Sequence, residues 1–164
     1  MNLIIYELNG VNIMALRLKD IVAAAKANIK EVTTKEAQDL FKCGGYKPLD
    51  VREAAEYLDG TIPMAVHVPR GMLEPMCDKC YEGHSGELAD LDQPWVVFCL
   101  SGGRGALAVD TMLKMGYTNV VNLAGGYSAW TQCSYPVSVP PTENGLIRLD
   151  HPWNPGFQEA SNVC

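Results

Sequence analysis

One of the six cysteines in this 164-residue chain stands where a nucleophile would be useful. Cys99 ends an apolar run and is followed by Leu100, Ser101, Gly102, Gly103 and Arg104. Two adjacent glycines allow a tight loop whose N–H groups point inward, and a helix that begins there adds its own N–H groups and positive dipole end. Such a cradle stabilises a thiolate. The spacing therefore predicts a nucleophilic cysteine, with Arg104 adding a positive charge that faces the same centre.

A buried strand and a helix are needed to position this loop. The continuous apolar run at 95–99 predicts a strand covered on both faces, a helix follows over 106–115, and 120–123 reads as the next strand. A strand, a helix and a strand within about 29 residues predict a parallel βαβ unit. With short strands also expected at 49–51 and 65–68, the pattern predicts the α/β class, with an open, mostly parallel sheet and helices on both faces.

The chain divides into three parts. Residues 1–30 form an N-terminal extension with one amphipathic helix, whose apolar stripe comprises Leu18, Ile21, Val22, Ala25 and Ile29. This stripe either packs on the domain or binds a partner. The domain itself covers 31–137, with its first helix capped by Thr33 and Glu36. Residues 138–164 form an extended, proline-rich tail, which Trp153 and Phe157 could anchor.

Composition excludes several classes of function. The formal net charge is −6 and the isoelectric point is about 5.0, which argues against binding to duplex nucleic acid or to an anionic membrane surface. No apolar run reaches the length of a membrane span. The first residues lack the basic start of a signal peptide, and Met14 is a second candidate start. We therefore expect a cytoplasmic protein whose cysteines are thiols.

Four separate segments together resemble the rhodanese-like domain family. The active-site half of that family's domain is similar to the stretch FCLSGGRGALAVDTMLKMGYTNVVNLAGGYSAW. Its N-terminal signature is similar to LDVREAAEY followed by GTIPMAVHVP. The resemblance covers about residues 31–137. It implies a single-domain sulfurtransferase in which Cys99 takes sulfur from thiosulfate or a persulfide donor. The resulting persulfide would pass its sulfur to cyanide or a thiol, and no metal or organic cofactor is implied.

Two features of the loop bear on alternative functions. Many relatives have Lys after the cysteine, whereas this chain has Leu100, which favours a neutral or protein-bound persulfide donor over the thiosulfate dianion. The same feature favours the alternative of a non-catalytic carrier of sulfur or a related chalcogen. Phosphatases and arsenate reductases of similar fold carry a Cys-x5-Arg loop, so the four residues between Cys99 and Arg104 make that function less favoured.

Further polar residues follow the other predicted strands. Because the carboxyl ends of parallel strands share one edge of the sheet, we expect Asp50 and Arg52 to brace the rim of the site and Arg70 to steer anions. A long irregular loop is expected over 70–94. It carries Cys77 and Cys80, which could be a redox or resolving pair for the persulfide, zinc ligands with a nearby histidine, or inert exposed thiols.

Overall fold

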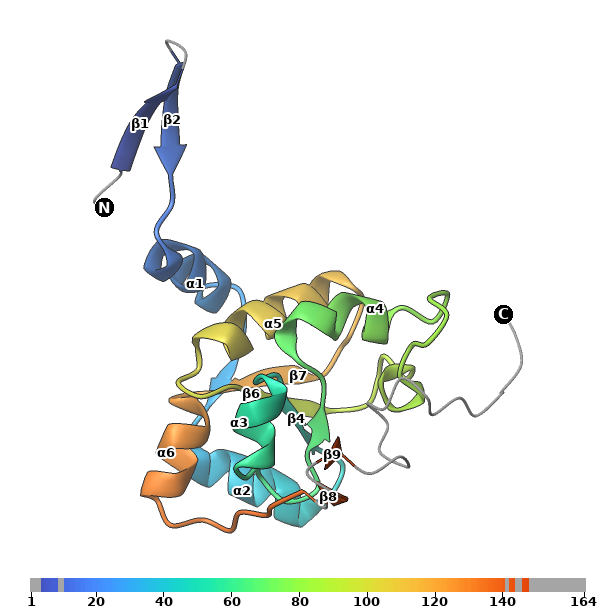
Figure 1. Cartoon of the computed structure of the whole chain (residues 1–164). Coiled ribbons are helices and arrows are strands. Elements are labelled where there is room, and N and C mark those ends of the chain that lie inside the picture. Colours follow the sequence, from blue (N-terminus) through green and yellow to red (C-terminus); the bar gives the residue numbers. More distant parts are fainter. Residues whose placement is uncertain (1–3, 9–10, 141, 144–145, 148–164) are drawn as a thin grey trace.

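A five-stranded, fully parallel sheet forms the centre of the molecule in the computed structural model (Figure 1). The structure describes residues 4–8, 11–140, 142–143 and 146–147. The strands are β3 (Glu31–Val32), β4 (Lys47–Asp50), β5 (Val66–His67), β6 (Trp95–Phe98) and β7 (Val120–Leu123). They lie in the order β3-β7-β6-β4-β5, so the strand before the cysteine loop is the central one.

Helices cover both faces of this sheet, as predicted (Figure 1). On one face, α4 (Leu73–Cys77) and α5 (Gly103–Lys114) bury Leu73, Val109 and Met112 against β4 and β6. On the other face, α2 (Thr34–Cys43) and α6 (Gly126–Gln132) bury Ala37 and Trp130. All four residues of β6 are fully buried, which explains why its sequence is apolar without alternation.

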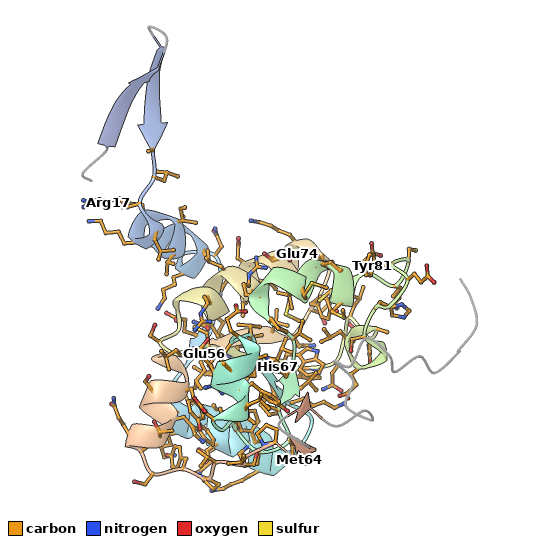
Figure 2. All side chains as sticks on the ribbon, viewed as in Figure 1. Arg17, Glu56, Met64, His67, Glu74 and Tyr81 are labelled. Carbon is orange, nitrogen blue, oxygen red and sulfur yellow. The ribbon has the colours of Figure 1, made fainter. Side chains whose placement is uncertain are left out.

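Local sequence signals set the ends of several helices. Thr33 caps α2, and the reciprocal bond with Glu36 is present as the capping-box spacing predicts. The short α3 (Ala54–Leu58) begins after Glu53, whose N–H donates to the carboxylate of Glu56 at 3.0 Å. This bond places Glu56 on the first turn of α3, facing the loop that follows β6 (Figure 2).

Two sequence-based expectations in this part of the chain need correction. The strand before the loop ends at Phe98, so Cys99 follows the strand and does not belong to it. The segment 70–94 is not uniformly irregular, because it contains α4 and the 3-10 turns η1 (Arg70–Met72) and η2 (Gly86–Leu88). Its residues Leu73 and Leu88 are fully buried, and this burial orders a segment that looks polar by composition.

The N-terminal extension contains an element that the sequence analysis did not anticipate. An antiparallel hairpin, β1 (Ile4–Leu8) with β2 (Val11–Ala15), extends away from the body of the molecule (Figure 1). The predicted helix is present as α1 (Leu18–Lys26). Only part of its stripe is covered, since Ala25 is buried while Leu18 remains 70% exposed.

Beyond α6 the chain returns along the domain. Ser138 pairs with Thr61 in an antiparallel bridge, and Trp130 donates its ring N–H to the carbonyl of Pro136 at 2.8 Å. Two short strands, β8 (Thr142–Glu143) and β9 (Leu146–Ile147), pair with each other farther along. The anchoring residues predicted for the tail, Trp153 and Phe157, lie outside the described residues.

Candidate active site

The loop between β6 and α5 holds the predicted nucleophile at the carboxyl edge of the central strand. Cys99 is 1% exposed, and the backbone N–H of Gly102 donates to its Sγ over 3.2 Å. Gly102 has φ of 96°, a left-handed conformation that glycine adopts without strain and that turns its N–H toward the sulfur. The helix α5 then begins at Gly103. Together, the loop N–H and the helix start provide a local environment that favours negative charge on the sulfur.

The first turn of α6 supports the loop from the neighbouring strand. The N–H of Tyr127 donates to the carbonyl of Cys99 at 2.8 Å, and that of Ser128 donates to the carbonyl of Leu100 at 3.0 Å. Gly126 permits this contact because a Cβ there would overlap the backbone of both loop residues. The role of this glycine is to let the backbones of α6 and the cysteine loop approach closely.

Asn122 is a buried residue of the site that the sequence analysis missed. Its side-chain amide donates to the carbonyl of Gly102 at 3.1 Å and to the carboxylate of Glu31 at 2.7 Å. On the helix side, Gly105 packs directly against Asn122, where a side chain would collide. The available signal was an asparagine inside an otherwise apolar strand, since a buried amide is normally retained with hydrogen-bond partners.

Arg104, which the spacing predicted to add a positive charge facing Cys99, is paired with a carboxylate in the structure. Its guanidinium forms two hydrogen bonds of 2.7 Å with the carboxylate of Glu56 on α3. The Arg104 hydrogen bond is the main cause that lowers the pKa of Glu56 to about 2. In return, the hydrogen bond to Glu56 raises the pKa of Arg104, and the nearby charge of Cys99 adds to this effect. Glu56 is thus part of the site, although no local spacing links it to the loop.

Asp50 and Arg52 form a buried ion pair beneath the rim. Arg52 donates to both carboxylate oxygens of Asp50, with the shortest bond at 2.6 Å, and also to the carbonyl of Gly60 at 2.7 Å. Thr61 adds a 2.8 Å bond to the same carboxylate. The guanidinium lies 4.1 Å from the ring centre of Tyr127 at the start of α6. This network connects α3, α6 and the strand ends in a region closed to water.

Arg70 is the third arginine predicted at this edge. Its guanidinium donates to both oxygens of Glu74, at 2.9 and 3.0 Å, and to the hydroxyl of Thr111 at 3.0 Å. Because Glu74 belongs to α4 and Thr111 to α5, these bonds place the guanidinium of Arg70 between the two helices. The structure therefore gives Arg70 a role in holding these two helices together, while its predicted role in steering anions stays a prediction.

Cys77 and Cys80 lie in different environments. Cys77 is buried at the end of α4, where desolvation raises the pKa of its thiol, so the alternative of two exposed thiols is wrong for this residue. Cys80 is exposed, in the segment that leads outward to Tyr81 (Figure 2). Among the residues that the structure describes, no cluster of three or more His, Cys, Asp and Glu side chains is arranged to hold a metal ion.

Comparison with known proteins assigns this fold and loop to a family. The family model for the Rhodanese-like domain matches residues 33–133, which include every strand of the central sheet from β4 to β7. The chain therefore belongs to the Rhodanese-like domain family, as its motifs predicted. In the described part of the chain, no helix has the length and apolar character to cross a membrane.

Individual relatives carry several kinds of name. The human thiosulfate:glutathione sulfurtransferase is 33% identical over 65% of this chain and 96% of its own length. The putative sulfur carrier protein YrkF of Bacillus subtilis is 37% identical over 51% of this chain, and the mitochondrial protein HIGH ARSENIC CONTENT 1 of Arabidopsis thaliana is 28% identical over 63%. These two matches span only 40% and 63% of the relatives themselves.

A solved structure matches a larger share of the chain. It is a protein from Rhodopseudomonas palustris described as a possible tyrosine phosphatase, with a TM-score of 0.71 and 30% identity. The match covers 75% of this chain and 95% of the neighbour. The comparisons thus show the family, while the names of individual relatives differ.

Proposed function

We propose that this protein transfers sulfane sulfur through a persulfide on Cys99. The Cys99 thiolate attacks the outer sulfur of thiosulfate or of a persulfide, the donor's S–S bond breaks, and sulfite or a thiolate leaves with the bonding electron pair. A thiophile, either cyanide or a thiol, then attacks the outer sulfur of the Cys99 persulfide and regenerates the thiolate. The cysteine itself carries the sulfur, so the cycle needs no redox partner.

The observation that carries the proposal is the bond from the Gly102 N–H to the Cys99 sulfur. A hydrogen-bond donor at the sulfur stabilises the Cys99 thiolate before the attack and the anionic persulfide after it, since both species hold negative charge at this rim. The carbonyls of Cys99 and Leu100 are meanwhile occupied by N–H groups of α6, which keeps the loop in the conformation that aims Gly102 at the sulfur.

The substitution Cys99→Ser tests this proposal. A serine hydroxyl does not ionise near neutral pH and cannot form a persulfide. The rate of sulfur transfer to cyanide should therefore fall below about a tenth of the wild-type rate. A tenfold loss corresponds to about 1.4 kcal/mol of barrier, and loss of the nucleophile should cost more than that. Mass spectrometry after exposure to donor should show one added sulfur on the wild-type protein and none on the variant. Cys43→Ser, at an exposed cysteine on α2, is the matched control and should behave as wild type.

A sulfur-carrier function is the second candidate. Leu100, beside the nucleophile, is 45% exposed and uncharged, so it offers no attraction to a small anionic donor. A carrier would load Cys99 from a protein persulfide and release the sulfur slowly to cyanide. A single round of loading without turnover supports the carrier, whereas many turnovers per Cys99 support the enzyme.

Phosphatase or arsenate reductase activity remains the less favoured alternative. A tetrahedral oxyanion needs a wider loop than one sulfur atom does, and here only four residues separate Cys99 from Arg104. The ranking of the two functions would be reversed if the protein hydrolysed a phosphotyrosine substitute, or reduced arsenate with a thiol, faster than it transferred sulfur.

A further inference from the structure

The cysteine loop has a single cationic side chain, and that side chain is already paired. Of residues 99–104, only Arg104 is cationic, and both of its terminal nitrogens bind the carboxylate of Glu56 at 2.7 Å. The pair is partly exposed, with 34% of the arginine side chain and 28% of the glutamate side chain accessible. It therefore lies at the rim, where the charge that it presents is felt by an entering donor.

The surrounding charges do not restore a positive rim. The exposed carboxylate of Glu53, at the start of the same helix, acts on Arg104 as a second negative charge. Arg52 is balanced by Asp50 in a buried ion pair, and Arg70 is held by Glu74. Each arginine that the strand ends bring to this edge thus has its own carboxylate.

We propose that Glu56 is a specificity-determining residue, which neutralises Arg104 and so makes the site select a sulfur donor of low charge, such as an organic persulfide or thiosulfonate monoanion, over the thiosulfate dianion. The inference rests on the proposed function of Cys99. It follows from Coulomb's law, because the electrostatic attraction of a dianion to an unpaired arginine would be twice that of a monoanion, and Glu56 removes this advantage. Glu56 acts through Arg104 and does not need to touch the donor.

Two sulfur donors of similar size distinguish an effect of the donor's charge from an effect of its shape. Thiosulfate carries two negative charges, and methanethiosulfonate carries one because a methyl group replaces an oxyanion. In both reactions the Cys99 thiolate forms a bond to the terminal sulfur and the donor's S–S bond breaks. Sulfite leaves in the first case and methanesulfinate in the second, each with the electron pair, so no oxidant or reductant is consumed.

The main variant is Glu56→Gln in the full chain. Glutamine keeps hydrogen-bonding capacity toward Arg104 and toward the N–H of Glu53 but leaves the guanidinium charge uncompensated. We expect kcat/KM for thiosulfate to rise on the order of threefold, the scale of a partly exposed charge pair, with a smaller rise for methanethiosulfonate. The gain should shrink at high salt, because the screening length falls from about 10 Å at 0.1 M to about 3 Å at 1 M.

Two further variants make the test specific. Glu53→Gln is the matched control, since it removes one negative charge from the same helix start without releasing Arg104, and it should change the thiosulfate-to-methanethiosulfonate ratio much less. Leu100→Lys adds a cation at an exposed position, so it should raise the same ratio and should fold normally even if Glu56→Gln does not.

The outcomes separate this inference from the function on which it rests. A higher ratio in Glu56→Gln, sensitive to salt and weaker in Glu53→Gln, supports the inference. If the Cys99 persulfide forms but the ratio is unchanged in folded Glu56→Gln, or in Leu100→Lys where Glu56→Gln does not fold, the inference is overturned and the proposed function still stands. If folded wild-type protein forms no Cys99 persulfide with either donor, both the function and the inference are wrong.

Discussion

Burial distinguishes the two cysteines of the segment 70–94, Cys77 and Cys80. At Cys77, desolvation is the larger effect and raises the pKa, while a hydrogen bond with Tyr117 lowers it by less. The same contact and the surrounding burial raise the pKa of Tyr117. Cys77 is therefore protonated near neutral pH and poorly reactive, whereas Cys80 is open to solvent. Within this pair, Cys80 is the better candidate for the resolving role predicted from the sequence.

We expect iodoacetamide at neutral pH to alkylate Cys80 on the order of tenfold faster than Cys77 in the folded protein, because Cys77 is buried and desolvation raises the pKa of its thiol, whereas Cys80 is exposed to the reagent. Peptide mass spectrometry over time measures both rates. In denaturant the two rates should become similar, which serves as the control. If Cys80 resolves the persulfide, Cys80→Ser should lengthen the lifetime of the Cys99 persulfide and Cys77→Ser should not; equal lifetimes in both variants would remove the resolving role.

At the scale of elements, two contacts hold the cysteine loop in place. The start of α6 binds the loop carbonyls from one side, and Glu56 on α3 holds Arg104 at the start of α5 from the other. Neither contact involves the sulfur itself. The contact from α6 holds the loop backbone that carries the Gly102 N–H, and the contact from α3 pairs the charge of Arg104.

Gly126→Ala should damage the loop without touching the nucleophile. The added Cβ would lie 2.8 Å from the carbonyl carbon of Leu100, and the residue has φ of 59°. The left-handed conformation alone costs roughly 1–2 kcal/mol for a residue with a Cβ, and the overlap displaces the loop as well. We expect a lower Tm and a loss of at least about tenfold in sulfur transfer, or 1.4 kcal/mol of barrier.

Gly44→Ala is the control for this change. Gly44 also has positive φ, at 76°, but open space surrounds its Cβ position at the end of α2. It should lower the Tm through backbone strain alone and leave the turnover per folded molecule unchanged. An equal loss of turnover in the two variants would show that Gly126 has no special role in supporting the loop.

The Glu56–Arg104 pair should make stability depend on acid pH. The pKa of Glu56 is about 2 in the folded protein against an ordinary 4.5, so folding favours the ionised carboxylate. Its stabilising contribution is complete above 4.5 and is lost as the pH falls toward about 2. Urea unfolding of wild type and Glu56→Gln across this window should show a difference in unfolding free energy, up to about 1 kcal/mol, that shrinks as the pH falls. A difference that stays constant would contradict this linkage.

At the scale of the whole molecule, the N-terminal segment joins the domain through one helix. The family match begins at residue 33, so the hairpin and α1 lie outside it. Val22 on α1 lies 3.7 Å from the Cβ position of Gly103, and Ala25 is buried. The hairpin extends beyond this contact, away from the sheet (Figure 1).

Removal of the hairpin alone and removal of the hairpin together with α1 should therefore have different effects. A chain that begins at Met14 should keep sulfur transfer within about twofold and a similar Tm, because the hairpin belongs to a separate, weakly coupled unit. A chain that begins at residue 28 should lose stability, since the apolar surface of α5 beneath Ala25 becomes exposed. Thermal unfolding and cyanide assays measure both effects. A large loss of activity in the first truncation would show that the hairpin contributes to the site.

Signals that act over a few residues could be interpreted without the fold. The order of strands and helices, the capping box at Thr33, and the Cys99–Arg104 spacing each depend on neighbours in the chain, and the structure has the predicted α/β architecture. The hairpin also has a local signal, since Asn-Gly between apolar runs, here Asn9-Gly10, is typical of a β-hairpin. Local sequence thus determined the class of the fold and the position of the candidate nucleophile.

The state of the charges around that nucleophile was decided only by the tertiary structure. Glu56 and Arg104 are 48 residues apart, and Glu31 and Asn122 are 91 residues apart. The first pair meets because β4, which precedes α3, lies beside β6, and the second pair meets because β3 lies beside β7. The burial of Cys77 likewise depends on packing against α5. Each of these features depends on contacts between segments that are distant in the sequence. Periodicity and spacing along the chain do not predict which distant segments come into contact.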